Sequence, residues 1–346
     1  MSSPNATDAN TLDRVAPAAT GQSNRPFFVF GSGRSGTTLL RLMISGHSRL
    51  NVSPETWFIV ELVEQLPTNR PLTPDEREQA IVIITGHYRW PDLAIAESTL
   101  RAELAPFPQP TLRAITDAVY AIVARAADKQ RIGDKTPAYV TILPQLARLY
   151  PDAQFIHLLR DGRDVALSFK DAGWTNRAYE GRKFEWTKAV RAAHAFAATM
   201  SPQAWHEIRY EDLVQSPETI VRALCAFLGE AFEPAMIDTA SRADLVPERE
   251  REFHKRLLGP IDSSRAGAWQ SRLDPLRLFI LEACLGPDLR ACGYALRYAG
   301  PAWRPVLAAS RAALTLAAPT LMRGIEVLKR RAPILKATPL HRRNPT

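Results

Sequence analysis

The sequence predicts a single α/β domain in which a parallel sheet carries helices on both of its faces. Short apolar runs near residues 26–30, 131–134, 154–160 and 205–210 indicate buried strands, and helical patterns lie between them. Parallel strands need such intervening segments because each strand must return to the same end of the sheet. No long Gly/Ser or Pro linker separates the motifs found between residues 31 and 269, so we expect one domain.

A glycine-rich loop follows the first predicted strand. Residues 26–41 have the sequence PFFVFGSGRSGTTLLR, in which the apolar run 27–30 breaks at residues 31–33 and a helical pattern begins at Thr37. When a strand, a glycine loop and a helix follow in this order, backbone N–H groups and the positive end of the helix dipole converge on a phosphate. We therefore expect a phosphate-binding loop at this point.

The spacing of this loop is P-loop-like, with one important substitution. Residues 31–38, GSGRSGTT, nearly fit the loop of nucleotide triphosphatases, which requires a lysine where this chain has Thr37. The cation of the loop, Arg34, comes three residues earlier. Because the missing lysine normally reaches the β- and γ-phosphates, we expect phosphate binding without ordinary ATP chemistry.

A second junction between a strand and a helix also favours anion binding. Residues 153–160, AQFIHLLR, predict a buried strand, and Asp161 is placed to cap the helix that follows. Arg160 ends the strand and supplies a charged fork, while Ser168 follows in the helix and supplies a hydroxyl donor. Both side chains can therefore converge on one anion.

Together the two junctions resemble those of sulfotransferases that use 3′-phosphoadenosine 5′-phosphosulfate (PAPS). Residues 34–40, RSGTTLL, resemble the 5′-phosphosulfate-binding loop, and Arg160 followed by Ser168 resembles the 3′-phosphate motif of that family. The resemblance implies an α/β enzyme with PAPS as the sulfuryl donor and PAP as the product. It also implies that PAPS is bound by Arg34, Ser35, Gly36, Thr37, Thr38, Arg160 and Ser168.

Two further segments fit the same family. Residues 206–213, HEIRYEDL, resemble a strand that ends in Tyr-Glu-Asp-Leu, which implies that Tyr210 lies near the adenine. The alternative for this tyrosine is a core aromatic ring with a satisfied hydroxyl. Residues 263–269 resemble the C-terminal region that closes over the 3′-phosphate, which implies roles for Ser264 and Arg265. The Arg-Lys-Gly triplet of the family is only partly kept here, because alanine takes the place of its lysine.

Sulfuryl transfer requires a base for the acceptor hydroxyl and cations for the leaving nucleotide. Cytosolic small-molecule sulfotransferases place a histidine two residues after a lysine; here Lys135 is present, but Pro137 stands in the histidine position. Protein-tyrosine sulfotransferases instead use a glutamate, at about the distance after the phosphate loop at which Glu55 follows Arg34. The resemblance therefore implies Glu55 as the general base, with Lys135 and Arg34 as the cations.

Alternatives to this catalytic assignment stay open. Glu55 is also consistent with an acid at the start of the helix before Trp57, where it would interact with the helix dipole. Asp134 is a second candidate for the base, or a group that orients Lys135. The reaction requires no metal in principle, since Arg34, Lys135 and the loop N–H groups can neutralise the leaving nucleotide, and we expect no metal site.

The acceptor class is left open by these motifs. A sugar, a lipid headgroup, a small alcohol and a tyrosine each offer a suitable hydroxyl, and we expect no nucleic-acid partner. Two rival functions are a metal-dependent P-loop kinase, which the missing lysine disfavours, and a nucleotide-binding adaptor that acts through a basic C-terminal tail.

The two ends of the chain differ from the predicted domain at residues 26–298. Residues 1–25 are polar, lack the apolar core of a signal peptide, and predict a disordered segment. Within the predicted tail at residues 299–346, nine Lys or Arg stand against one acid from residue 301 on, and 9 − 1 = +8 equals the formal charge of the whole chain. The tail is also amphipathic, so we expect either peripheral contact with the inner membrane surface or packing on the domain. Three sparse cysteines indicate buried free thiols and a cytoplasmic protein.

Overall fold

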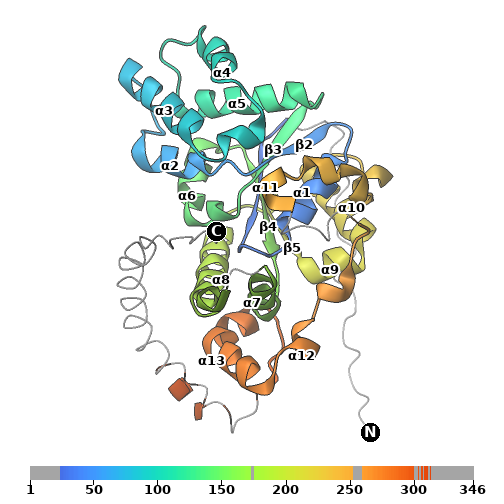
Figure 1. Cartoon of the computed structure of the whole chain (residues 1–346). Helices are drawn as coiled ribbons and strands as arrows, with labels where there is room; N and C mark the ends of the chain where they lie inside the picture. The colour runs from blue at the N-terminus through green and yellow to red at the C-terminus, as the bar shows by residue number, and fades with distance from the viewer. Residues whose placement is uncertain are drawn as a thin grey trace, which may run out of the picture. The chain divides into compact units, whose positions relative to one another are not determined.

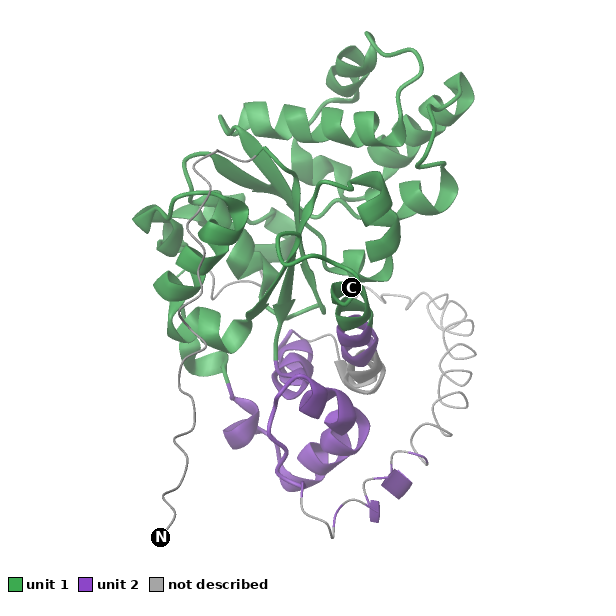
Figure 2. Cartoon of the chain, turned by 180° about the vertical axis from the view of Figure 1, so that it is seen from behind, with its two compact units in different colours: residues 1–160, 192–266 green, residues 161–191, 267–346 purple. Residues whose placement is uncertain are grey.

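The computed structural model describes residues 24–172, 175–251 and 259–299, together with residues 303, 305, 306, 308–310 and 312. The chain divides into two compact units (Figure 2). The first unit comprises the described parts of residues 1–160 and 192–266, and the second comprises those of residues 161–191 and 267–346. Most of the predicted N-terminal segment and of the predicted basic tail lies outside the described residues, so both stay predictions.

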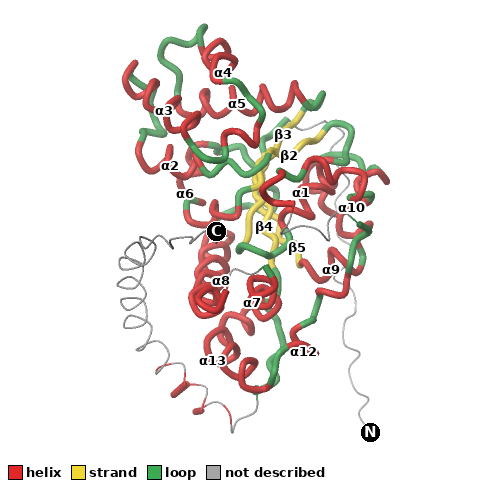
Figure 3. Tube along the Cα trace, in the orientation of Figure 1, coloured by secondary structure: helices red, strands yellow, loops and turns green. Residues whose placement is uncertain are grey.

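A five-stranded sheet forms the centre of the first unit, where its strands lie side by side (Figure 3). All of its strands are parallel, as the sequence predicted. The strand order is β2-β3-β1-β4-β5, so the strand that precedes the glycine loop is central. One strand, β2, was not predicted because it is only four residues long and two of them are polar. The strands are β1 (Phe27–Gly31), β2 (Leu50–Ser53), β3 (Arg131–Lys135), β4 (Gln154–Leu159) and β5 (Trp205–Arg209).

Helices cover both faces of this sheet, which confirms the predicted layering (Figure 1). Phe28 and Phe155 face a cluster built from α2 to α6 and the end of α8, whereas Phe27 and Val29 face α1, α9 and α10. The helices are α1 (Thr37–Ser45), α2 (Phe58–Gln65), α3 (Pro74–Gly86), α4 (Glu97–Leu104), α5 (Leu112–Ala126), α6 (Leu143–Leu149), α7 (Gly162–Asp171), α8 (Thr175–Ala197), α9 (Tyr210–Gln215), α10 (Pro217–Leu228), α11 (Glu248–Arg251), α12 (Trp269–Arg272) and α13 (Pro275–Ala291).

The central strand β1 is buried on both sides. Its four apolar residues, at positions 27–30, are each at most 1% exposed. Burial of one such side chain stabilises the fold by roughly 1.5–3 kcal/mol, so these four residues together make a substantial contribution to stability. Gly133 lies directly opposite Phe27 in the neighbouring strand β3, and the lack of a side chain there leaves space for the Phe27 ring.

Helix boundaries follow the local signals that the sequence contains. Helix α10 begins with Pro217 in its first turn and ends before Gly229, whose φ of 76° requires the left-handed conformation that glycine adopts without strain. Ser216 occupies the N-cap position of this helix without a side-chain capping bond. At α7 the predicted cap is confirmed, since the Asp161 carboxylate accepts a hydrogen bond from the Arg163 backbone N–H at 2.8 Å.

The second unit contains α7, the first part of α8, α12 and α13. Arg163 of α7 is buried there, donates to Asp161 and to Glu282 at 2.7 Å each, and lies 3.6 Å from the centre of the Trp269 ring. Asp164 accepts a hydrogen bond from the Trp269 backbone N–H at 2.8 Å. A buried guanidinium is tolerated because two carboxylates and an aromatic face replace its hydration.

The three cysteines, Cys225, Cys284 and Cys292, are buried and form no disulfide, as expected. Among the described residues, no helix combines the length and the apolar character that crossing a bilayer requires.

Replacing Gly133 by alanine should destabilise the first unit. A Cβ at this position would lie 2.1 Å from the Phe27 ring, which has no free volume to move into because it is fully buried. Overpacking of this kind typically costs about 1–3 kcal/mol, and urea unfolding should show a loss of this size. Gly86→Ala is the matched control. A Cβ added at this position would meet no other part of the described structure within 4 Å, so the free energy of unfolding should stay the same or rise. A Gly133→Ala variant as stable as the wild type would contradict this packing.

Candidate functional site

The candidate site lies where the C-terminal ends of β1, β2 and β3 meet. In the register of the sheet, Val29 pairs with Lys135, and Ser53 pairs with Asp134. The glycine loop leaves β1, the segment with Glu55 leaves β2, and β3 ends on Lys135. This edge is where ligands bind in parallel α/β sheets, because the loops and helix N-termini that follow the strands converge there.

The phosphate loop has two residues with positive φ angles, of which one is a glycine and the other is not. Gly36 has a φ of 104°, and a Cβ there would lie 2.5 Å from the Tyr210 ring, so glycine is required twice over. Arg34 is also left-handed, with a φ of 67°. Non-glycine residues in this region store strain and cluster at functional sites. Thr37 and Thr38 begin α1, so the loop leads directly into a helix N-terminus.

Three predicted residues from distant segments meet at this loop. Arg160, at the end of β4, donates from one guanidinium nitrogen to the Arg34 carbonyl at 3.1 Å and from another to the Arg265 carbonyl at 3.0 Å. The guanidinium also lies 4.1 Å from the centre of the Tyr210 ring. Because the same ring packs against Gly36, Tyr210 positions Arg160 beside the loop.

The predicted catalytic pair is in direct contact. Lys135 Nζ donates to Glu55 Oε1 at 2.6 Å and also lies 3.4 Å from Thr38 Oγ1. The Lys135 side chain is fully buried, whereas that of Glu55 keeps 11% of its surface exposed. The second carboxylate oxygen of Glu55 accepts from Trp57 Nε1 at 2.7 Å and from Arg89 at 3.0 Å. The structure thus brings Glu55 and Lys135 together with the phosphate loop.

The charges around Glu55 set its protonation state. Burial raises the pKa of this carboxyl, but the attraction of Lys135 and Arg89 outweighs burial and lowers the pKa to about 2. Arg89 is itself shared, since it also contacts Asp92 and Glu250. Arg89 was missed in the sequence because it belongs to no motif and lies in the helical insertion at residues 58–130.

Asp134 points away from this pair. Neighbouring residues of a strand face opposite sides of the sheet, and the Asp134 carboxylate accepts hydrogen bonds from four hydroxyls. Because its carboxylate faces the other side of the sheet from Lys135 and is enclosed by these hydroxyls, Asp134 is disfavoured as the base. Its hydrogen bonds fix the segment that follows Glu55, and they do not orient Lys135. The four donors are Thr56, Thr136, Tyr120 and Tyr139.

Ser168 and Ser264 are the remaining predicted residues. Ser168 lies on α7 in the second unit and is partly buried. Ser264 is exposed in a short helical turn at Ser263–Arg265, where its backbone N–H donates to Asp262 at 2.8 Å. Their contacts with a nucleotide stay predictions.

Comparison with known proteins agrees with this geometry. A model of the sulfotransferase family matches residues 26–234, more than half of the chain. Protein-tyrosine sulfotransferase 2 of Gallus gallus is 23% identical over 216 residues, which cover 61% of this chain and 52% of that protein. Nodulation protein NoeE of Sinorhizobium fredii is 26% identical over 286 residues, which cover 76% of this chain and 64% of that protein. The chain thus spans less than two thirds of the length of either relative.

Solved structures with the same fold include the sulfotransferase domain from the curacin biosynthetic pathway. It is 23% identical, with a TM-score of 0.56, and the match covers 80% of this chain and all of that domain. The sulfotransferase domain of the Synechococcus PCC 7002 olefin synthase gives a TM-score of 0.55 at 23% identity, over 81% of this chain and all of that domain. The fold is therefore that of sulfotransferase domains.

The chain belongs to the sulfotransferase family, and the resemblance found in its sequence motifs is confirmed. Residues of the loop fit a phosphate-bearing ligand such as PAPS. The Ser35 hydroxyl is buried, and no described residue gives it a hydrogen-bond partner. A buried hydroxyl without a partner indicates a missing ligand or water, and a phosphate oxygen satisfies it.

Replacing Lys135 by methionine should lower the free energy of unfolding at neutral pH, and the loss should shrink as the pH falls. The pKa of Glu55 is lowered from 4.5 to about 2, so the ion pair stabilises the fold above the unfolded-state pKa and loses this effect as the pH falls through about 2. Without Lys135, burial raises the pKa of the Glu55 carboxyl. Denaturant unfolding should therefore show a deficit of the variant at neutral pH that shrinks steadily toward pH 2. Lys188→Met is the control at an exposed position, and any difference in its free energy of unfolding from the wild type should not vary with pH. A deficit of Lys135→Met that stays constant with pH would contradict the ion pair.

Proposed function

We propose that this chain transfers a sulfuryl group from PAPS to a hydroxyl acceptor and releases PAP. The observation that carries the proposal is the 2.6 Å ion pair between Glu55 and Lys135 beside a phosphate-binding loop. A base and a cation within reach of one anion site are what an in-line group transfer requires. Family membership supports the reaction class and leaves the rival P-loop kinase without support.

Each predicted residue has a task in this reaction. The loop at residues 34–38 binds the 5′-phosphosulfate through its N–H groups and Arg34, and Arg160 with Ser168 binds the 3′-phosphate. Glu55 accepts the proton of the acceptor hydroxyl. A bond forms between the acceptor oxygen and sulfur as the bond from sulfur to the bridging oxygen breaks. Lys135 donates a hydrogen bond to that oxygen, which leaves on PAP with the negative charge.

The ion pair explains why the base stays inactive until the donor is bound. A carboxylate with a pKa of about 2 is a weak base, because the ideal base has a pKa near the working pH. When Lys135 turns from Glu55 to the bridging oxygen, the carboxylate loses its nearest cation and its pKa rises. Lys135 therefore links leaving-group stabilisation to activation of the base.

The acceptor is a molecule with a free hydroxyl. One relative is named for protein tyrosine and another for nodulation, so the names of the relatives span different processes. A tyrosine, a sugar, a lipid headgroup and a small alcohol all remain within the proposal, as does contact of the tail with an acidic membrane surface.

Glu55→Gln should keep the shape and the affinity for PAP while losing rate. General-base catalysis contributes about 10²–10⁴-fold, and the loss should fall in this range and appear in kcat. The readout is sulfate transfer from labelled PAPS to a panel of hydroxyl acceptors, with PAP binding followed by calorimetry. Glu61→Gln, in the exposed part of α2, is the matched control and should turn over as the wild type does.

Two outcomes would count against the mechanism. Wild-type turnover by Glu55→Gln places the base elsewhere, although sulfuryl transfer itself would stand. A protein that binds neither PAP nor PAPS would overturn the proposed function as a whole.

A further inference from the structure

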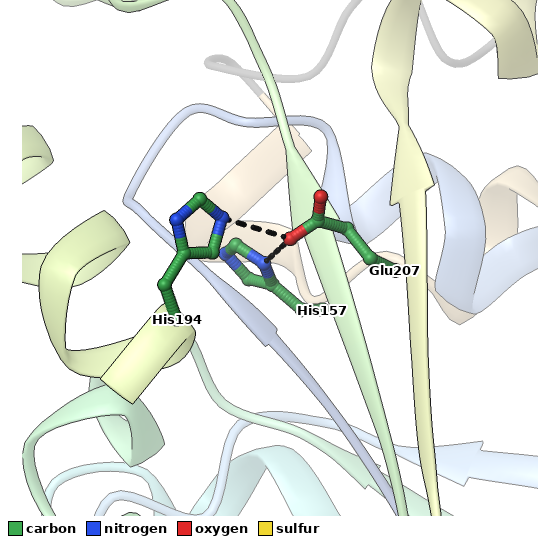
Figure 4. Close-up of side chains that lie close together, drawn as sticks. All are labelled: His157, His194 and Glu207. Atoms are coloured by element: carbon green, nitrogen blue, oxygen red, sulfur yellow. Dashed lines mark hydrogen bonds and ion pairs between the residues drawn. The ribbon is translucent and has the colours of Figure 1, made fainter. Parts of the chain in front are cut away.

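A cluster of two histidines and a glutamate lies on the opposite face of the sheet from Lys135. His157 is on β4, Glu207 is on β5, and His194 is on the last turns of α8 (Figure 4). His157 packs against Phe30, on the sheet face covered by α2 to α6 and the end of α8, whereas Lys135 contacts Thr38 of α1 on the other face. The cluster therefore belongs to a different place from the catalytic pair.

The three side chains converge on one point. His157 Nδ1 lies 2.8 Å from Glu207 Oε2, and His194 Nε2 lies 3.2 Å from the same oxygen. One ligand atom from each of the three residues lies within 4.8 Å of the other two. Ligand atoms around a tetrahedral zinc ion at its usual bond lengths are about 3.3 Å apart, so small side-chain movements would admit an ion.

The backbone holds this arrangement rigidly. His157 and Glu207 are direct partners in the pairing of β4 with β5. His194 is fixed because Phe196, on the same helix end, packs 5.1 Å from the ring of Phe155 and 6.0 Å from that of Trp205. Three ligands on packed strands and a packed helix are preorganised, which lowers the entropy lost on binding an ion.

The His157 imidazole is 1% exposed, and Nδ1 is the ring nitrogen that faces Glu207 and would bind the ion. The ring is enclosed by Phe30 and Trp205, and such an apolar shell strengthens electrostatic bonds to an ion.

The charges of the cluster also suit a cation. The ion-pair partners of Glu207 in the described part of the chain are the two histidines, with no lysine or arginine competing for its carboxylate. Two imidazoles and one carboxylate are a donor set of zinc sites that keep an open fourth position.

We propose that His157, His194 and Glu207 bind a divalent first-row transition metal, with Zn²⁺ as the best match. The ion fastens the end of α8 to β4 and β5, and water completes its coordination, since the side chains of His194 and Glu207 are 36% and 31% exposed. The spacing of the three residues in the sequence follows no metal-binding motif, which is why the sequence predicted no metal.

The test is a titration of the full chain, without a polyhistidine tag, after treatment with a chelator that is then removed. Calorimetry should show one Zn²⁺ bound per chain, and Co²⁺ as a probe should give the absorption of a low-coordinate site. His194→Ala and Glu207→Gln should each weaken binding more than about 100-fold, since even residues that only support a ligand contribute 10–100-fold. Both changes are at exposed side chains, so both variants should fold.

His206→Gln is the matched control. His206 neighbours Glu207 but faces the other side of β5, where its ring stacks on Phe227 at 4.9 Å, so its loss should leave Zn²⁺ binding unchanged. Zn²⁺ should also raise the Tm of the wild type and of this control, but not that of His194→Ala. No saturable binding by the wild type, or equal binding by the wild type and both ligand variants, would overturn the site.

Discussion

The ion pair between Lys135 and Glu55 is the interaction on which the proposed function of this molecule depends. Lys135 is fully buried at the end of β3, and a buried ammonium is stable only when an anion lies against it. In the free protein that anion is Glu55. In the proposed reaction the anion becomes the leaving oxygen of the nucleotide, so the same constraint that holds the fold together at this point also directs Lys135 toward the donor. The proposed catalytic pair therefore also has a structural role, because the buried Lys135 ammonium requires an anion beside it.

The position of this pair depends on a second buried charge on the other face of the sheet. Asp134 accepts hydrogen bonds from Thr136, which directly follows β3, from Tyr120 of α5 and from Thr56, the residue that follows Glu55. Loss of the carboxylate would remove the acceptor that these buried hydroxyls share, and a buried donor left unpaired costs about 1–3 kcal/mol. Consecutive residues of one strand therefore have separate tasks, because their side chains face opposite sides: Asp134 fixes the segment that Lys135 then contacts.

Much of the fold could be predicted from the sequence, because its signals are local. The apolar run of β1, the glycine loop and the helix cap at Asp161 each carry their own chemistry, and each is confirmed. The roles of Glu55 and Lys135 were proposed from the family resemblance, whereas their direct contact is a finding of the structure. What could not be predicted depends on packing between distant segments. Arg89 reaches Glu55 from an insertion without a motif, and the three residues of the His157 cluster, His157, His194 and Glu207, meet only because β4, β5 and α8 pack together.

The most direct test of the account is the pKa of Glu55 with and without PAP, measured by carbon NMR of the labelled carboxyl group. We predict that the pKa of Glu55 is near 2 in the free protein, and that this pKa rises by at least about one unit when PAP draws Lys135 away. The rise should be smaller in Lys135→Met, whose Glu55 has no lysine to lose. A Glu55 pKa that stays near 2 with saturating PAP would contradict the account.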